Sequence, residues 1–180
     1  TDGYQVYHKL AKEKGDLTVA GCWAHARRRY EEAVKALPAK SRKSSLAWQA
    51  LEQINMIYHV DNTLKELTPE ERKKRRQDSV KPLVEAYFAW VKEKKKDGRI
   101  AEKSKTGKGL SYSLNQEEYL KVFLENGNVP LDNNAAERAI RNFCIGRKNW
   151  VIIDTIRGAQ SSAMIYSIAE TAKANHLKPY

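Results

Sequence analysis

Two carboxylates of this sequence stand in settings that suit metal-dependent chemistry on phosphodiesters. Asp2 precedes Gly3 at the predicted end of a strand, and Glu137 falls in the first turn of a helix that residues 132–134 are predicted to begin. Active sites of α/β proteins gather at the carboxyl ends of parallel strands. Phosphodiester chemistry commonly uses two Mg²⁺ ions about 3.5–4 Å apart, held by carboxylates, because hard cations prefer oxygen ligands. Asp2 and Glu137 are therefore candidate catalytic residues and metal ligands.

Each of the two acids also has an ordinary structural explanation. An Asp before a Gly is most often a turn residue. Asn134-x-x-Glu137 has the spacing of a capping box, and Glu137 precedes Arg141 by four residues, the spacing of a helical ion pair. Both interpretations stay open for each acid taken alone, and the occurrence of the two together favours the metal site.

Cys22 and His25 form a Cys-x-x-His pair, which is too small a ligand set for a structural zinc site. One interpretation is a buried Cys beside a core or capping His. The other is that His25 has a functional role. His25 is therefore a third candidate catalytic residue.

Several cationic side chains are placed where they could contact phosphates. The candidates for DNA binding are Arg27 and Arg28, followed in sequence by Arg29, and the residues that flank Glu137, namely Arg138, Arg141, Arg147 and Lys148. The residues that flank Glu137 are the better candidates. The run Arg27–Arg29, the run from Arg72 to Arg76 and the segment Lys94–Lys108 are weaker ones, since charge runs are usually solvated faces. Trp150 either stacks on a base or closes the core.

The composition favours a polyanionic partner. Lys and Arg number 33 against 22 Asp and Glu, so the net charge is +11 and the sequence pI is about 9.6. No apolar run approaches the roughly 20 residues that cross a bilayer, and no signal peptide is visible. Two cysteines fit a reducing cytoplasm. These features predict a cytoplasmic, nucleoid-associated protein that binds nucleic acid and no membrane.

The first predicted elements outline a βαβ unit. Thr1–Gly3 would end one strand or form a turn, and Tyr4–Lys14 would form a short helix. The nearly continuous apolar run Leu17–Trp23 would form a strand buried on both faces. A further short strand is predicted for Lys148–Ile153. Two helices, about Asn134–Phe143 and Ala159–Ala174, would flank it.

The middle of the chain has a helical pattern. Helices are predicted for Arg27–Leu37, for Ser45–Leu67 and for the stretch after Thr68, where Thr68 and Glu71 have capping-box spacing. The Lys-rich, Gly-containing segment Lys94–Lys108 predicts a flexible loop.

These elements predict an α/β fold that is predominantly helical. A small core would consist of residues 1–25 and 127–180, and an all-helical insertion, residues 26–126, would separate its two parts. An inserted lobe with its own packed helices explains an interruption of roughly 100 residues better than a loop does.

Five strings of the sequence closely resemble transposases of the bacterial insertion-sequence sixty-six family. They are TDGYQVY at the start and the strings that begin at Gly21 (GCWAHARRRYEEA), Ser104 (SKTGKGLSYSLNQ), Leu131 (LDNNAAERAIRNFCIGRKNW) and Arg157 (RGAQSSAMIYSIAETAKANHLKPY). The strings are long, and the resemblance extends over nearly the whole chain. Cys22-x-x-His25 also resembles the motif that follows the second Asp in several transposase superfamilies. This resemblance implies that His25 lines the active site and contacts the DNA backbone or the scissile phosphate.

The resemblance implies metal-dependent DNA cleavage and strand transfer by an Asp-Asp-Glu triad on an RNase H-like fold. Asp2 matches the second Asp and Glu137 the Glu, while the first Asp would lie upstream of Thr1 with the early strands. The chain would then carry a partial RNase H-like core, bind metal weakly and lack transposition activity alone. The implied cofactor is Mg²⁺, with Mn²⁺ as a substitute. The implied partners are transposon-end and target DNA and further copies of the protein.

A second hypothesis comes from a different class of function. The basic composition and the missing triad member also suit a non-catalytic DNA-binding or assembly module. Such a module would bind DNA in a salt-sensitive way without needing Asp2, Glu137 or Mg²⁺.

Overall fold

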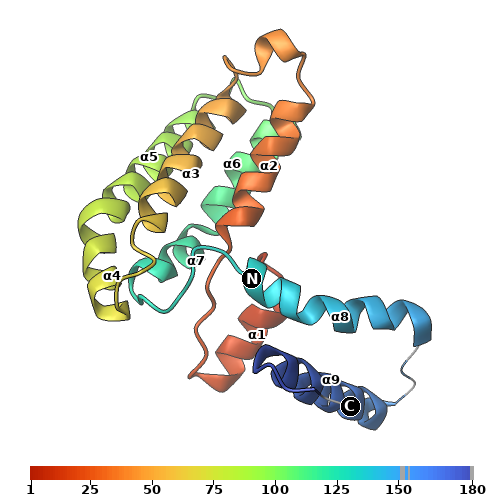
Figure 1. Cartoon of the computed structure of the whole chain (residues 1–180). Coiled ribbons are helices and arrows are strands. Elements are labelled where there is room, and N and C mark those ends of the chain that lie inside the picture. The colour runs from red at the N-terminus through yellow and green to blue at the C-terminus, as the bar shows by residue number, and fades with distance from the viewer. Residues whose placement is uncertain (151–152, 154, 179–180) are drawn as a thin grey trace. The chain divides into compact units, whose positions relative to one another are not determined.

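Helices make up all the regular secondary structure of the residues that the computed structural model describes (Figure 1). These are residues 1–150, 153 and 155–178, and the side chains of residues 142 and 145–150 are not among the described parts. In chain order the helices are α1 (Gln5–Lys14), α2 (Trp23–Lys35), η1 (Ala39–Ser41), α3 (Leu46–Asn62), α4 (Pro69–Arg75), η2 (Arg76–Val80), α5 (Lys81–Lys96), α6 (Lys105–Asn115), α7 (Glu117–Lys121), η3 (Val122–Leu124), α8 (Asn134–Trp150) and α9 (Ile156–Ala174). No strand occurs in these residues. The predicted α/β fold with a partial RNase H-like core is therefore wrong.

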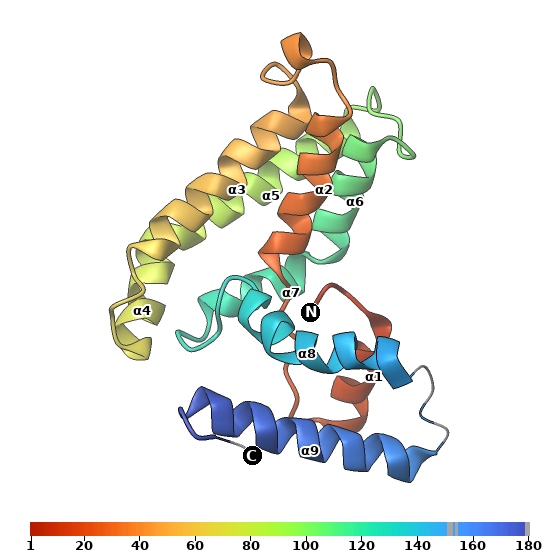
Figure 2. The same ribbon diagram turned by 45° about the vertical axis from the view of Figure 1, so that its right-hand side comes forward.

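The chain divides into two compact units, Thr1–Asn133 and Asn134–Tyr180. In the first unit α2 packs on α3, α3 on α5, α5 on α6 and α6 back on α2, so the four helices form a bundle (Figures 1 and 2). Large buried side chains from all four helices fill its core, among them Trp23, Tyr30, Ile54, Phe88 and Leu110. The predicted division of the chain into a core of residues 1–25 and 127–180 and an insertion of residues 26–126 stays a prediction. No described helix is long and apolar enough to cross a membrane.

The predicted buried strand Leu17–Trp23 is wrong. Residues 17–22 have no regular secondary structure, and Trp23 begins α2. Val19, Cys22 and Trp23 are the buried residues of the run, whereas Leu17 is exposed. The Trp23 indole N–H donates to the Leu120 carbonyl at 2.9 Å. A short apolar run does not distinguish a buried strand from the buried start of a helix. Here the bundle core, rather than a sheet, takes up the apolar side chains.

The strand predicted for Lys148–Ile153 is wrong over its first half. Helix α8 continues through Trp150, so residues 148–150 are helical. Val151 and Ile152 lie outside the described residues. The pattern of α8 is amphipathic at helical spacing over its whole length, which explains why it extends beyond the predicted end at Phe143.

Several helix predictions are confirmed. Thr68 begins α4 with a complete capping box: its hydroxyl accepts from the Glu71 N–H at 3.3 Å, and the Glu71 carboxylate accepts from the Thr68 N–H at 3.1 Å. Two bonds from Thr68 to the carboxylate hold the pKa of Glu71 below its ordinary value. The loop predicted for Lys94–Lys108 is wrong at its two ends, because α5 continues to Lys96 and α6 begins at Lys105, whereas residues 97–104 between them have no regular secondary structure.

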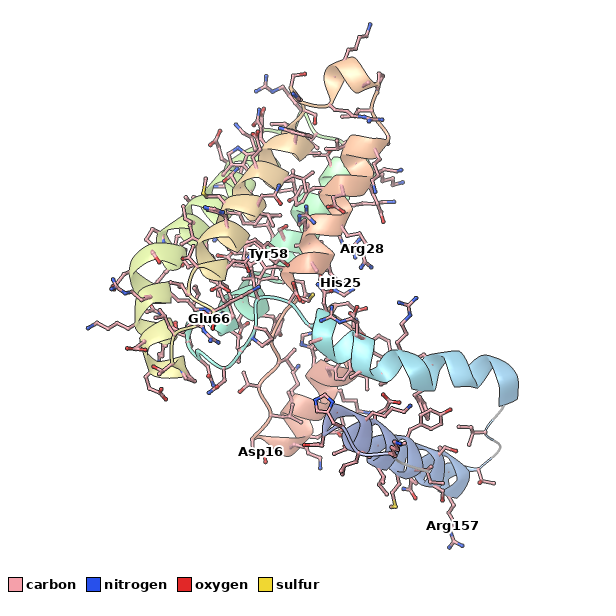
Figure 3. All side chains as sticks on the ribbon, viewed as in Figure 1. Asp16, His25, Arg28, Tyr58, Glu66 and Arg157 are labelled. Carbon is pink, nitrogen blue, oxygen red and sulfur yellow. The ribbon has the colours of Figure 1, made fainter. Side chains whose placement is uncertain are left out.

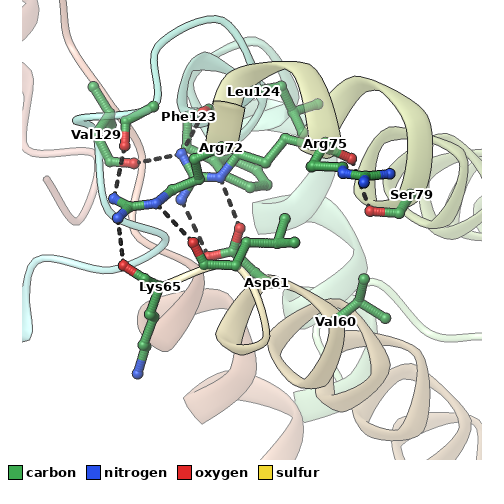
Figure 4. Close-up of polar contacts among 12 residues, drawn as sticks. Val60, Asp61, Lys65, Arg72, Arg75, Ser79, Phe123, Leu124 and Val129 are labelled. Atoms are coloured by element: carbon green, nitrogen blue, oxygen red, sulfur yellow. Dashed lines mark hydrogen bonds and ion pairs between the residues drawn. The ribbon is translucent and has the colours of Figure 1, made fainter. Parts of the chain in front are cut away.

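Two arginines of the Arg72–Arg76 run bind the protein's own backbone (Figure 4). Arg76, only 2% exposed, pairs with buried Asp61 at 2.7 and 3.1 Å and donates to the carbonyls of residues 123, 126 and 129. Arg72 donates to the carbonyls of residues 64, 65, 67 and 127. These guanidinium groups fasten the end of α3 to the segment after α7. They are therefore not available for phosphates.

Three buried hydroxyl groups join α2, α5 and α6. Tyr87 and Ser113 approach to 2.7 Å and Tyr30 and Ser113 to 3.2 Å, while Ser113 also donates to the Gly109 carbonyl. Burial raises the pKa of Tyr30 and of Tyr87. Gly109 allows the close packing, since a Cβ there would lie 2.8 Å from the Tyr30 ring. Part of the SKTGKGLSYSLNQ string is thus explained by the bundle core.

The second unit is a pair of helices, α8 and α9, joined through residues 151–155. Phe143 and Tyr166 meet edge to face, with ring centroids 5.3 Å apart. A groove of about 590 Å³ runs along the pair, lined largely by alanines and these two rings. Helix α9 buries none of its residues, and Met164 and Ile168 are well exposed. The unit is thus held together by few contacts between its helices.

Candidate active site

Asp2 lies in an exposed turn just before α1. Its carboxylate oxygen Oδ1 accepts from the backbone N–H of Tyr4 at 3.0 Å, and the Thr1 hydroxyl accepts from the N–H of Gly3, also at 3.0 Å. The turn interpretation of Asp2 is confirmed by the first of these bonds. It leaves the metal-ligand interpretation open, because the carboxylate is exposed to solvent.

Helix α6 and the residue after it hold the backbone of the Asp2 turn. The Tyr112 hydroxyl donates to the Asp2 carbonyl at 3.2 Å. Gly3 has a φ of 89° and packs so closely on Gln116 that a Cβ would lie 2.9 Å from its Nε2. The strings TDGY and SKTGKGLSYSLNQ, far apart in the sequence, therefore meet at the turn that carries Asp2.

Tyr112 is a neutral donor in this arrangement. Burial raises its pKa to about 12, the nearby Arg29 lowers it in part, and Cys22 and Asp2 raise it further. The Arg29 guanidinium lies 4.2 Å from the centre of the Tyr112 ring. Tyr112 was not predicted as a site residue. The signal that could have identified it is its position in SKTGKGLSYSLNQ, one of the strings that resemble the family.

Cys22 and His25 lie at the N-terminal end of α2. Cys22 is fully buried, precedes the first helical residue and accepts from the His25 N–H through its carbonyl at 3.2 Å. His25 is half-buried in the first turn (Figure 3). The predicted contact of His25 with a phosphate stays a prediction.

Asp132 also reaches this end of the bundle. Its Oδ2 accepts from the Tyr58 hydroxyl at 3.2 Å, and the neighbouring Leu131 carbonyl accepts from the Trp23 N–H. Burial, followed by the charge of Asp132, raises the pKa of Tyr58 far above its ordinary value, and Cys22 raises it further. Asp132 was predicted only to start a helix. Its bond to Tyr58 makes it part of the structure around Cys22.

The candidate DNA-binding residues near α2 differ in their surroundings. Arg27 is engaged within the bundle: its Nε donates to Asn55 at 2.9 Å and its guanidinium pairs with Glu31 at 2.8 Å. Arg28 is exposed and projects from α2 (Figure 3). Of the two, Arg28 has the guanidinium better placed for an external phosphate.

Glu137 lies in the second unit, in the first turn of α8, as predicted, and is exposed. Arg138 and Arg141 are exposed on the same helix. The backbone of Arg147, Lys148 and Trp150 is helical, but their side chains lie outside the described residues. Asp2 and Glu137 belong to different units, each described by itself, so a site shared by the two carboxylates stays a prediction.

The sequence pattern of the transposase IS66 family matches residues 1–161. This chain belongs to that family. The matched region contains Asp2, His25 and Glu137 together with the bundle. The members of the IS66 family are transposases, which are enzymes that act on DNA. The IS66 assignment confirms the resemblance found in the sequence.

Relatives of this IS66 family chain occur in Sinorhizobium fredii. The uncharacterised proteins y4hP and y4qI are each 30% identical over 99% of the chain, which corresponds to 33% of their own length. A third, y4jD, is 28% identical over 99% of the chain and 35% of its own length. The chain thus spans about a third of the curated relatives it matches. No solved structure matches it.

An Asp-Asp-Glu transposase family implies a divalent metal in general. The exposed carboxylates of Asp2 and Glu137 offer the hard oxygen atoms that Mg²⁺ takes. Among the described residues, no group of three or more His, Cys, Asp or Glu side chains is arranged to hold a metal ion. The two acids fit the metal in donor chemistry, and they supply only part of a ligand set.

Proposed function

We propose that this chain is part of the catalytic region of a DNA transposase, and that Asp2 and Glu137 are two of its three metal-binding acids. The observation that carries the proposal is the family match, which places both acids within one matched region, residues 1–161. The net charge of +11 supports DNA as the substrate.

The proposed reaction has two steps on DNA. Water hydrolyses a phosphodiester at the transposon end and leaves a free 3′-hydroxyl. That hydroxyl then attacks a phosphodiester of the target, so that one P–O bond forms as another breaks. Divalent metal bound by Asp2 and Glu137 would supply charge stabilisation for the attacking and leaving oxygens.

The remaining candidate residues would orient the phosphates. Arg28 on α2 and Arg138 and Arg141 on α8 are exposed cations on rigid helices. His25 lies in the first turn of α2, a helix that packs on α6, from which Tyr112 holds the Asp2 turn. Arg147, Lys148 and Trp150 complete the proposed set of DNA-binding residues, and they are included because of their positions in the sequence.

The test is Glu137→Gln in the whole protein, because the amide keeps the side-chain shape and removes the charge that binds metal. We expect strand cleavage of transposon-end DNA to fall by at least about 10³-fold while DNA affinity is retained. Glu70→Gln is a matched control, since Glu70 is also an exposed acid in the first turn of a helix, α4. Undiminished cleavage by the Glu137 variant would sink the assignment.

The basic composition of the chain, with a net charge of +11, also suits a second candidate, a non-catalytic DNA-binding or assembly module. This candidate predicts that Mg²⁺ and Glu137 have no effect on any activity of the whole protein. Metal-dependent cleavage that is lost in the Glu137 variant would exclude it.

A further inference from the structure

The positive charge of the chain is concentrated at one end of the four-helix bundle. Residues 35–45 connect α2 to α3, and residues 93–108 connect α5 to α6; we call these two segments together the distal basic end. They contain eleven Lys and Arg and three acids, a net charge of +8 out of +11 for the whole chain. The other 153 residues therefore carry only +3.

The fold brings these two segments to the same end of the bundle. Because successive helices run in opposite directions, the α2–α3 and α5–α6 connections emerge together, as both ribbon views show (Figures 1 and 2). The N-termini of α3 and α6 are at this end as well, capped by Ser45 and Ser104. Their helix dipoles add to the positive potential.

The acids of the distal basic end are already neutralised. Glu93 pairs with Lys94 at 2.7 Å, Asp97 with Arg99 at 2.6 Å, and Glu102 with Lys95 at 2.6 Å. The cations that remain have no carboxylate partner in the part of the chain that the structure describes. Six of them, all exposed, are Lys40, Arg42, Lys43, Lys103, Lys105 and Lys108.

We propose that the distal basic end binds the phosphate backbone of duplex DNA, at a surface separate from the Asp2 turn. Like charges this close together repel one another, and a polyanion relieves that repulsion while releasing its own counterions. Lysines on loops and helix ends contact phosphates as point charges without reading bases. The binding is therefore independent of sequence and steeply salt-dependent.

This inference rests on the proposed DNA substrate and not on the catalytic acids. The test is fluorescence anisotropy of the full chain with a random-sequence duplex in chelator, which keeps metal-dependent steps out of the measurement. The variant carries Lys103→Gln, Lys105→Gln and Lys108→Gln. The control carries Lys65→Gln, Lys73→Gln and Lys74→Gln, three exposed lysines at the opposite end of the bundle that remove the same charge.

We expect the distal variant to bind at least about tenfold more weakly at moderate salt. The slope of log affinity against log salt is negative, and its magnitude should fall by about 3. Each of the three lost phosphate contacts removes about 0.9 from that magnitude. The control should keep most of the affinity and slope. Equal losses in both variants, no loss in the distal variant, or binding of the chain to anionic phosphatidylserine vesicles but not to the duplex would each overturn the proposal.

Discussion

The two ends of the bundle use the same kind of side chain in opposite ways. At the end where α3 leads into α4, Arg72 and Arg76 bind seven backbone carbonyls and the buried carboxylate of Asp61. At the distal basic end, Lys40, Lys43 and Lys103 are exposed to solvent without a carboxylate partner among the described residues. The first set of cations stabilises the fold, and the second is available to a ligand.

The difference follows from what surrounds each cation. Segments without regular structure leave backbone carbonyls unpaired, and a guanidinium that satisfies several of them can be buried without an unpaired charge. The segment after α7 supplies such carbonyls to Arg76, whereas the distal connections form hydrogen bonds within themselves. Charge runs that look alike in the sequence therefore separate into structural and ligand-binding groups.

The largest expected effect on stability is at Arg76. Arg76→Met leaves the buried carboxylate of Asp61 without its partner, so we expect the free energy of unfolding to fall by about 3–5 kcal/mol. Urea denaturation followed by circular dichroism measures it. Arg75→Met is the matched control, because Arg75 is the adjacent, exposed arginine and its loss should change stability by no more than about 0.5 kcal/mol. Similar values for the two variants would remove the distinction between buried and exposed arginines.

A smaller effect is expected where α6 packs on α2. Gly109→Ala places a methyl group 2.8 Å from the buried ring of Tyr30, and such overpacking costs about 1–3 kcal/mol. Ala is a better helix former than Gly by about 1 kcal/mol, so the net loss should be about 0–2 kcal/mol. Lys108→Ala, at the exposed neighbouring position, should leave stability unchanged or slightly raised. If the Gly109→Ala variant were instead more stable than the unchanged protein by ~1 kcal/mol, the full difference in helix propensity between Ala and Gly, the packing around residue 109 would be looser than in the structure.

The smallest of these effects is expected at the Asp2 turn. Tyr112→Phe removes the hydroxyl that donates to the Asp2 carbonyl and keeps the ring beside Arg29, so the loss should be about 0.5–1.5 kcal/mol. Faster amide exchange at Gly3 and Tyr4 should accompany it. Tyr119→Phe is the control, because the Tyr119 hydroxyl has no hydrogen bond among the described residues. Unchanged exchange in the Tyr112 variant would show that the bond does not order the turn.

Much of the helical part of the molecule was predictable from the sequence. The capping box at Thr68 and the apolar stripes of α2, α3 and α5 act locally, so the residues that form each helix also specify it. The predicted strand Leu17–Trp23 failed for a different reason. Cys22 and Trp23 at the end of this run are buried, although they form no strand. An apolar run predicts that its side chains are buried, but it does not predict whether a sheet or a helix bundle covers them.

The candidate site divides in the same way. Asp2, His25 and Glu137 were chosen by residue type, spacing and resemblance to the family, and their catalytic roles stay predictions. Tyr112, Tyr58 and Asp132 were missed, because their roles depend on contacts across 74 and 110 residues of chain. A tyrosine in a helix looks like a core residue until the carbonyl or carboxylate that its hydroxyl meets is known.

The sequence by itself determined the family, the basic character of the chain and most of its helices, since each depends on residue identity or local spacing. The tertiary structure alone decided that the described chain is all helical, that Arg72 and Arg76 are internal, and that two basic segments far apart in the sequence meet at one end of the bundle. Those outcomes depend on which helices pack together, because packing over long separations sets the partner of each backbone group and each charge.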